Sequence, residues 1–217
     1  MKKVLLMALG FFAFQAVSAQ ESISYKPTKG TVTTEVGLNG GLNNAEIDLN
    51  DGIVKFRYFL KDDLALRAGL GLSSYKDVDY FEEGSDTDKN SDTNIKLGIE
   101  KHFSGTNRLS TYAGAELVFG FGKESSDEIY DNGDFDSFEQ KNSSFGLGIF
   151  TGADYYVAKK LYLGIEAGVS FMNQKTKDAE YSSQFGDDDV NTSSTPGSKG
   201  TTFATVAFGG IRVGFQF

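Results

Sequence analysis

Apolar and polar residues alternate along two long stretches of the chain. From Leu109 to Gly122 the odd positions carry Leu, Thr, Ala, Ala, Leu, Phe and Phe, whereas the even positions carry Ser, Tyr, Gly, Glu, Val, Gly and Gly. The stretch from Leu161 to Met172 repeats this pattern, again with its apolar residues at odd positions. A period of two places successive side chains on opposite faces of a β-strand, whereas an amphipathic helix needs apolar spacings of three and four. The pattern therefore predicts strands.

The same pattern predicts eight strands in all. They cover roughly residues 31–42, 52–60, 64–76, 93–103, 108–122, 143–157, 161–174 and 200–217. Three connections are tight turns, at 61–63, 104–107 and 158–160, and they alternate with four longer loops. Short turns at one end and long loops at the other are typical of up-and-down barrels in bacterial outer membranes. We therefore predict an all-β fold, an eight-stranded antiparallel up-and-down transmembrane β-barrel.

The first residues have the features of an export signal. Lys2 and Lys3 precede an apolar run from Val4 to Phe14, and Val17-Ser18-Ala19 supplies the small residues that signal peptidase requires. The apolar run is shorter than the roughly 20 residues that a spanning helix needs. We predict cleavage after Ala19, which gives a signal peptide at 1–19, a periplasmic N-terminal extension at 20–30 and an outer-membrane barrel at 31–217.

Composition removes several classes of function. The net charge of -9 provides no basic surface to replace the counterions of nucleic acid, so we expect no nucleic-acid partner. Without cysteine and with a single histidine, His102, the chain cannot form thiolate or multi-histidine metal sites. We predict no cofactor. His102 falls near the predicted periplasmic turns, away from the outer rim, so we also predict that the protein is not an enzyme.

One parity of each predicted strand is suited to hydrocarbon. Examples are Ile95, Leu97, Ile99 and Phe103 in the fourth strand, and Ile211, Val213, Phe215 and Phe217 in the last. Aromatic residues on this face form two predicted girdles: Tyr58, Phe103, Tyr155, Phe215 and Phe217 at the turn end, and Phe119, Phe121, Phe145, Phe171 and Phe203 at the loop end. Gly209-Gly210 is a candidate bulge in the last strand.

The opposite parity collects glycine and charge. The predicted inner face carries Glu35, Lys55, Arg57, Arg67, Lys96, Glu100, Glu116, Asp154, Glu166 and Arg212, five acids and five bases. The interior of an eight-stranded barrel is just wide enough for side chains, so these charges must pair. We favour a polar lumen plugged by side chains over a transport path or an active site. A soluble lipocalin-like barrel would have the reverse parity.

The predicted outer loops are rich in acid. Residues 77–92 and 124–139 hold seven acidic residues each, and Asp187-Asp188-Asp189 follows in the last loop. Carboxylates suit divalent cations, and the candidate metal ligands are Asp86, Asp88, Asn90 and Asp92, which carry oxygen at alternate positions. This segment lacks the turn glycine and the glutamate at position 12 of a calcium loop, and a solvated surface loop is the alternative.

Two segments carry a resemblance to a known family. The hairpin from Tyr58-Phe59-Leu60 to Leu72 and the closing segment from Gly209-Gly210 to Phe217 resemble the outer-membrane β-barrel domain family, a porin family that includes small OmpA- and OmpX-like barrels. The resemblance covers the chain from about residue 30 onward. It implies that Phe215 and Phe217 form the signal that the barrel-assembly machinery reads.

These observations favour a structural or interaction role in the outer membrane of a Gram-negative bacterium. The alternatives are a porin-like channel for small solutes, and a surface adhesin or ligand-binding barrel that acts through its loops. The expected partners are outer-membrane lipid and lipopolysaccharide, the barrel-assembly machinery and divalent cations at the outer loops. We expect a monomer.

Overall fold

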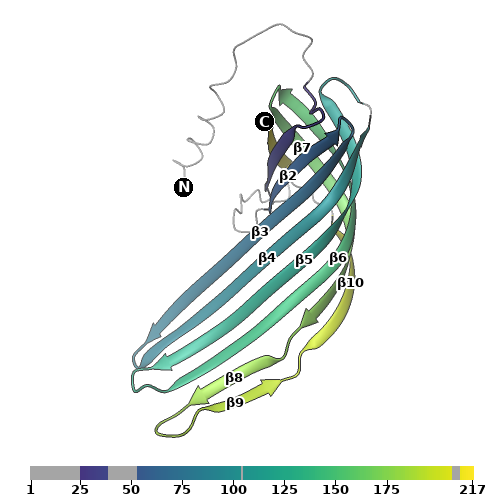
Figure 1. Ribbon diagram of the computed structural model, residues 1–217. Helices are drawn as coiled ribbons and strands as arrows, with labels where there is room; N and C mark the ends of the chain where they lie inside the picture. The colour runs from purple at the N-terminus through teal and green to yellow at the C-terminus, as the bar shows by residue number, and fades with distance from the viewer. Residues whose placement is uncertain (1–24, 39–52, 104, 207–210) are drawn as a thin grey trace.

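A computed structural model describes residues 25–38, 53–103, 105–206 and 211–217 of the protein (Figure 1). Within these ranges the strands are β1 (Val32–Leu38), β2 (Ile53–Lys61), β3 (Leu64–Phe81), β4 (Gly84–Phe103), β5 (Leu109–Tyr130), β6 (Phe135–Ala158), β7 (Leu161–Thr176), β8 (Ala179–Gln184), β9 (Asn191–Thr195), β10 (Ser198–Val206) and β11 (Ile211–Gln216). No helix in this part of the chain is both long enough and apolar enough to cross a membrane.

Eight of the strands close into a ring. Strands β1 to β7 pair in chain order, each antiparallel to the next, and β11 pairs with both β7 and β1. Strands that are adjacent in the ring therefore follow one another in chain order, and the last strand pairs with the first. This arrangement is an up-and-down barrel. This confirms the predicted fold.

Strands β10 and β11 together occupy the eighth place in the ring, next to β7. Strand β10 lies nearer the outer end of the barrel and β11 nearer the short turns. Both β10 and β11 pair with β7: Val206 lies opposite Gly168, and Arg212 lies opposite Gly164. The backbone of Phe203 lies opposite Phe171, as the predicted outer girdle requires. The bulge predicted at Gly209-Gly210 lies outside the described residues.

Strands continue through two of the segments that we expected to be long loops, and that expectation is wrong. Strands β3 and β4 stay paired up to a turn at 82–83, and β5 and β6 stay paired up to a turn at 131–134. Asn132-Gly133 is a strong signal for a hairpin turn, and Gly133 has the positive φ of 95° that such a turn requires. In Figure 1 the four strands run together far beyond β2, and the β8–β9 hairpin follows β6.

Burial alternates along the ring strands. In β3, for example, Ala65 and Arg67 are buried while Leu66 and Leu70 are exposed. In every strand from β2 to β7, large apolar side chains are exposed at the positions that, like Leu66 and Leu70, face away from the interior. A continuous apolar exterior around a charged interior is the reverse of a soluble barrel and fits a lipid surround.

The aromatic residues of β6 mark the height of the membrane. From Phe145 to Tyr155 the strand has eleven residues, about the length with which a tilted strand crosses the hydrocarbon. Strand β6 continues from Phe145 for ten further residues to Phe135. The outer parts of β3 to β7 and of β10, together with the β8–β9 hairpin, therefore stand beyond the hydrocarbon, and we call them the outer ribbon.

Candidate functional site

All ten charged residues predicted for the inner face lie inside the ring. Each of the eight ring strands contributes at least one of them, because each strand has one inward parity. Eight of the ten are buried, and the side chains of Lys55 and Lys96 are only 13% and 11% exposed. The interior therefore holds five carboxylates and five cations in a space that largely excludes water.

Arg57 joins three strands from the lower part of the interior. Its guanidinium lies 2.9 Å from Glu35 on β1, 3.3 Å from Glu100 on β4 and 2.5 Å from Asp154 on β6. Three carboxylates around one guanidinium provide the charge compensation that a buried ion needs. Arg57 thus links opposite walls of the barrel.

Arg67 has the same role higher in the barrel. Its side chain on β3 lies 3.2 Å from Glu100, 3.1 Å from Glu116 and 2.9 Å from Glu166. The guanidinium also stacks 3.8 Å from the centre of the Phe150 ring, a cation–π contact.

The remaining cations complete a single connected network. Arg212 pairs with Glu35 at 2.6 Å and with Glu166 at 3.1 Å. Lys55 also pairs with Glu166, at 3.1 Å, and Lys96 lies 3.5 Å from Glu116. Every one of the ten residues has at least one partner of opposite charge within the network.

Tyrosine hydroxyls supply further hydrogen bonds to the carboxylates. Tyr112 donates to Glu166 at 3.0 Å and accepts from Arg212, and Tyr162 donates to Glu35 at 3.2 Å. Both rings are fully buried. Glycine makes room for them: a Cβ at Gly214 would collide with the Tyr162 ring, and one at Gly152 would collide with Tyr112.

His102 belongs to the network, although the sequence analysis placed it only at the rim. Its Nδ1 lies 3.0 Å from the Ser110 hydroxyl and its Nε2 lies 3.2 Å from Glu100. His102 has the inward parity of Glu100, which was the signal that could have found it. All three residues are buried, and Glu100 already compensates Arg57 and Arg67.

The described part of the N-terminal extension folds over the turn end of the barrel. The Gly30 amide donates to the Phe59 carbonyl at 2.8 Å, and the Lys29 amide donates to Asp62 at 2.8 Å. Pro27 is buried and helps to line a pocket of about 190 Å³ together with His102. This segment therefore covers the turn end of the interior.

The four candidate metal ligands lie on a straight part of β4. Asp86, Asp88, Asn90 and Asp92 share one face of this strand, so they follow one another along it and do not wrap a common centre. Asp86 accepts a hydrogen bond from Ser126 on β5 at 3.3 Å. In the described part of the chain no group of three or more His, Asp or Glu residues is placed to hold a metal ion.

The other predicted site residues lie at the two ends of the chain. Phe215 is on the outward face of β11, and Phe217 follows that strand with its amide donating to the Val32 carbonyl at 2.9 Å. Phe217 is 68% exposed, as a residue in contact with lipid would be. Ala19, the predicted cleavage site, lies outside the described residues.

Lysines and acids also meet on the outward face of the outer ribbon. Glu139 on β6 lies between Lys123 at 2.5 Å and Lys141 at 2.6 Å. Hydrogen bonds from Lys123 and Lys141 hold the pKa of the Glu139 carboxyl below its usual value. These pairs are one third to one half exposed, so their contribution to stability is small.

A closed ring of eight strands with an apolar exterior and a paired, charged interior defines the class of protein: an outer-membrane β-barrel protein. The comparison with protein families identifies the family within this class. The model of the "Putative OmpA-OmpF-like porin family" matches residues 74–195, which is more than half of the chain. The protein belongs to this family and lies in the outer membrane of a Gram-negative bacterium.

The chain is also similar to several solved structures. Ail, the attachment invasion locus protein of Yersinia pestis, is 12% identical, with a TM-score of 0.43 over 88% of this chain and 100% of Ail. The N-terminal barrel of Pseudomonas aeruginosa OprF is 16% identical, with a TM-score of 0.37 over 88% and 100%. Acinetobacter baumannii CarO is 13% identical, with a TM-score of 0.34 over 87% and 97%. No curated protein matches the chain.

Proposed function

We propose that the protein is a closed, non-conducting barrel with a structural or interaction role, and that it is not an enzyme. The observation that carries this proposal is the single network of ten paired charges, to which all eight ring strands contribute. An ion passing through would have to separate pairs that are held at 2.5 to 3.5 Å in a space with little water. That separation is costly, because each buried charge would lose its partner.

Bulky rings and the N-terminal extension support the same proposal. Tyr112, Tyr156 and Tyr162 are fully buried in the interior, and Phe150 is only 6% exposed. Residues 25–31 cover the turn end. The charges therefore form part of a packed polar core and do not line an open path.

Single-channel recording of the refolded protein in planar bilayers tests the proposal. We expect no stable conductance in the nanosiemens range at any applied voltage that the bilayer tolerates. A stable open pore of that size would overturn the closed barrel and favour the channel. A double variant, Arg67→Ala with Glu166→Ala, is a useful comparison because it removes one internal pair and should raise conductance if the network is the barrier.

A second candidate function is surface binding through the outer ribbon. The observation that favours it is the set of exposed apolar side chains beyond the hydrocarbon, among them Tyr80 at 83% and Ile129 at 54% exposed. Rigid barrels often carry binding residues on the segments that project from them. Replacing Tyr80 and Ile129 with serine should then abolish retention on host or matrix surfaces while leaving the barrel folded.

A further inference from the structure

The lysines of the outer ribbon lie on one of its two faces. The strand register places six exposed lysines on the face that meets lipid farther down the same strands: Lys76, Lys89, Lys123, Lys141, Lys175 and Lys199. The lysine face also carries Asp127, Glu139 and Glu180, whereas the other face carries acids alone, among them Asp77, Asp79, Asp86, Asp88, Glu128 and Asp136. Solvation does not require the lysines to share one face, so their placement calls for an explanation of its own.

The lysines lie at the level of lipid headgroups. Lys141 is four residues beyond Phe145, and Lys175 is four residues beyond Phe171, both of which belong to the outer aromatic girdle. Four residues of a strand tilted by about 45° rise roughly 10 Å. Since the girdle marks the edge of the hydrocarbon, the lysine ammonium groups fall within the headgroup layer of the outer leaflet.

Three pairs of lysines stand directly opposite each other on neighbouring strands. They are Lys76 with Lys89, Lys123 with Lys141, and Lys175 with Lys199. Like charges in this position destabilise a sheet unless an anion lies near. Glu139 supplies that anion for the second pair, and Asp127 lies 3.2 Å from Lys89 in the first.

The third pair differs. Lys175 on β7 and Lys199 on β10 both lie in the described part of the chain. Among the described residues, neither lysine forms an ion pair with an acid. The destabilising contact of two ammonium groups is therefore left uncompensated by the chain itself. An external anion would supply what the sequence does not.

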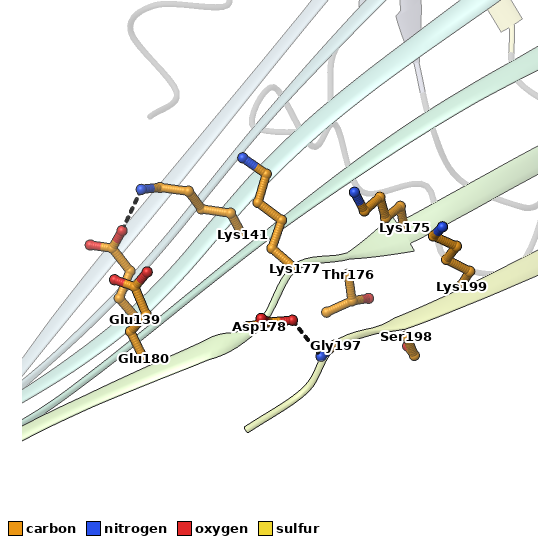
Figure 2. A pocket seen from close by; sticks show the side chains of 10 residues that line it. All are labelled: Glu139, Lys141, Lys175, Thr176, Lys177, Asp178, Glu180, Gly197, Ser198 and Lys199. Carbon is orange, nitrogen blue, oxygen red and sulfur yellow. Dashed lines mark hydrogen bonds and ion pairs between the residues drawn. The ribbon is translucent and has the colours of Figure 1, made fainter. Parts of the chain in front are cut away.

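A pocket adjoins this pair. The pairing of the chain with β6 is interrupted at 177–178, between the end of β7 and the start of β8, and the facing break at 196–197 separates β9 from β10. Residues on both sides of this break line a cavity of about 640 Å³. Figure 2 shows the side chains of Lys141, Lys175, Lys177 and Lys199 extending to the same side of the strands. Three acids also line the pocket: Glu139 binds Lys141, Asp178 accepts a hydrogen bond from the Gly197 amide at 3.0 Å, and Glu180 lies opposite Glu139 on β8.

We propose that Lys175 and Lys199, with Lys177 and Lys141 beside them, bind the phosphate groups of lipopolysaccharide. Ammonium groups are compact charges that bind phosphate well, and four of them line one pocket. Lys141, Lys175 and Lys199 have the parity that meets lipid farther down their strands, and they lie at the height of the headgroups, so the lipid of the outer leaflet is the occupant that fits. The inference goes beyond the proposed function, because a closed barrel does not require a bound lipid.

Titration of the folded, detergent-solubilised protein with fluorescent lipopolysaccharide tests the site. The double variant Lys175→Gln with Lys199→Gln should weaken binding at least tenfold. The matched control is Lys76→Gln with Lys89→Gln, which removes the same charge from another opposed pair at a similar height but outside the pocket. We expect the control to change the affinity less than twofold, and circular dichroism to report the same β-structure for both variants.

A second titration uses lipopolysaccharide from which the lipid phosphates have been removed. The wild-type protein should bind it at least tenfold more weakly. In a competition experiment, 10 mM inorganic phosphate should displace the intact lipid only in part, because the free ion lacks the lipid's contact with the barrel wall.

The proposal would be overturned by any of three outcomes: equal loss of affinity in the two double variants, equal binding of the dephosphorylated lipid, or complete displacement by phosphate. A pore in bilayer recordings would overturn the closed barrel but leave these results unaffected.

Discussion

At the scale of single residues, parity decides the environment of each side chain. Lys96 and Leu97 are neighbours in β4, yet Lys96 reaches Glu116 inside the barrel while Leu97 is half exposed to the lipid side. The alternation was predictable from the sequence, because a period of two has only one structural meaning in a strand. The particular pairings were not predictable, since they depend on the stagger between strands that are far apart in the chain.

Leu97→Arg should be strongly destabilising. The substitution places a charge against hydrocarbon near the middle of the membrane, at a cost of about 2 to 4 kcal/mol. The matched control is Lys96→Arg, which keeps a cation near Glu116. Urea titration of both variants in lipid vesicles measures the difference. Similar losses in the free energy of unfolding would contradict the assignment of Leu97 to the lipid face and Lys96 to the interior.

Removing a carboxylate should matter only inside the barrel. Glu116 and Glu139 each bind two cations, but Glu116 is buried, whereas the side chain of Glu139 is 33% exposed. Glu116→Ala leaves five buried cations with four carboxylates and should cost about 3 to 5 kcal/mol of folding free energy. Glu139→Ala should cost less than about 1 kcal/mol. Equal effects in the same urea assay would mean that the interior is as wet as the surface.

At the scale of elements, the sequence predicted the ends of the strands near the short turns better than their outer ends. The eight ring positions and the three short turns were all evident from alternation and turn residues. The outer halves of β3 to β6 were not, because their inward positions carry acid, and we took acid to mean loop. Asp77-Val78-Asp79-Tyr80 in fact alternates as regularly as the membrane part. Backbone pairing along neighbouring strands keeps such a ribbon extended whatever its side chains.

Glycine on the inner face should be irreplaceable where a ring packs on it. In Gly214→Ala the new Cβ collides with the Tyr162 ring, which is fully buried and bonded to Glu35 and so cannot turn away. We expect a loss of about 1 to 3 kcal/mol, as for other overpacked cores. Gly37→Ala on the adjacent strand β1 is the control, since no described atom lies within 4 Å of its Cβ. Thermal or urea unfolding that does not separate the two variants would contradict this packing.

At the scale of the whole molecule, closure of the ring depends on its last strand. β11 pairs with β1 on one side and with β7 on the other, so the barrel is complete only when residues 211–216 are in place. The class of fold could be predicted because eight alternating strands, short turns at one end and an apolar exterior are together typical of an up-and-down membrane barrel. The lysine pocket could not be predicted, because it lies at the break in strand pairing between β7 and β8, which no local pattern signals.

Phe217→Ala tests the assembly signal without disturbing the hydrogen bonds of the last strand. The alanine keeps the amide that donates to Val32, so the pairing of β1 with β11 is retained. If the terminal aromatic is read by the assembly machinery, the variant should accumulate in the periplasm. Tyr155→Ala removes a girdle aromatic elsewhere and should reach the outer membrane normally. Fractionation of cells and immunoblotting measure both; equal outer-membrane levels would contradict the signal.

The orientation of the barrel can be tested with two proteases, because the two ends differ in the residues of their turns. The outer turns at 82–83, 131–134 and 185–190 contain acids and no lysine or arginine, whereas the opposite end carries Lys159, Lys160 and Arg108. With the exception of Lys177, the lysines of the outer ribbon lie within paired strands, which resist cleavage.

In cells that carry the Lys177→Gln variant, a protease specific for acidic residues should therefore cut the protein from outside, and trypsin should not. After the outer membrane is permeabilised, trypsin should cut at 158–160. Cleavage of intact cells by trypsin at 158–160 would show that the barrel is inserted the other way, and it would also place the lysine pocket on the wrong side of the membrane to meet lipopolysaccharide.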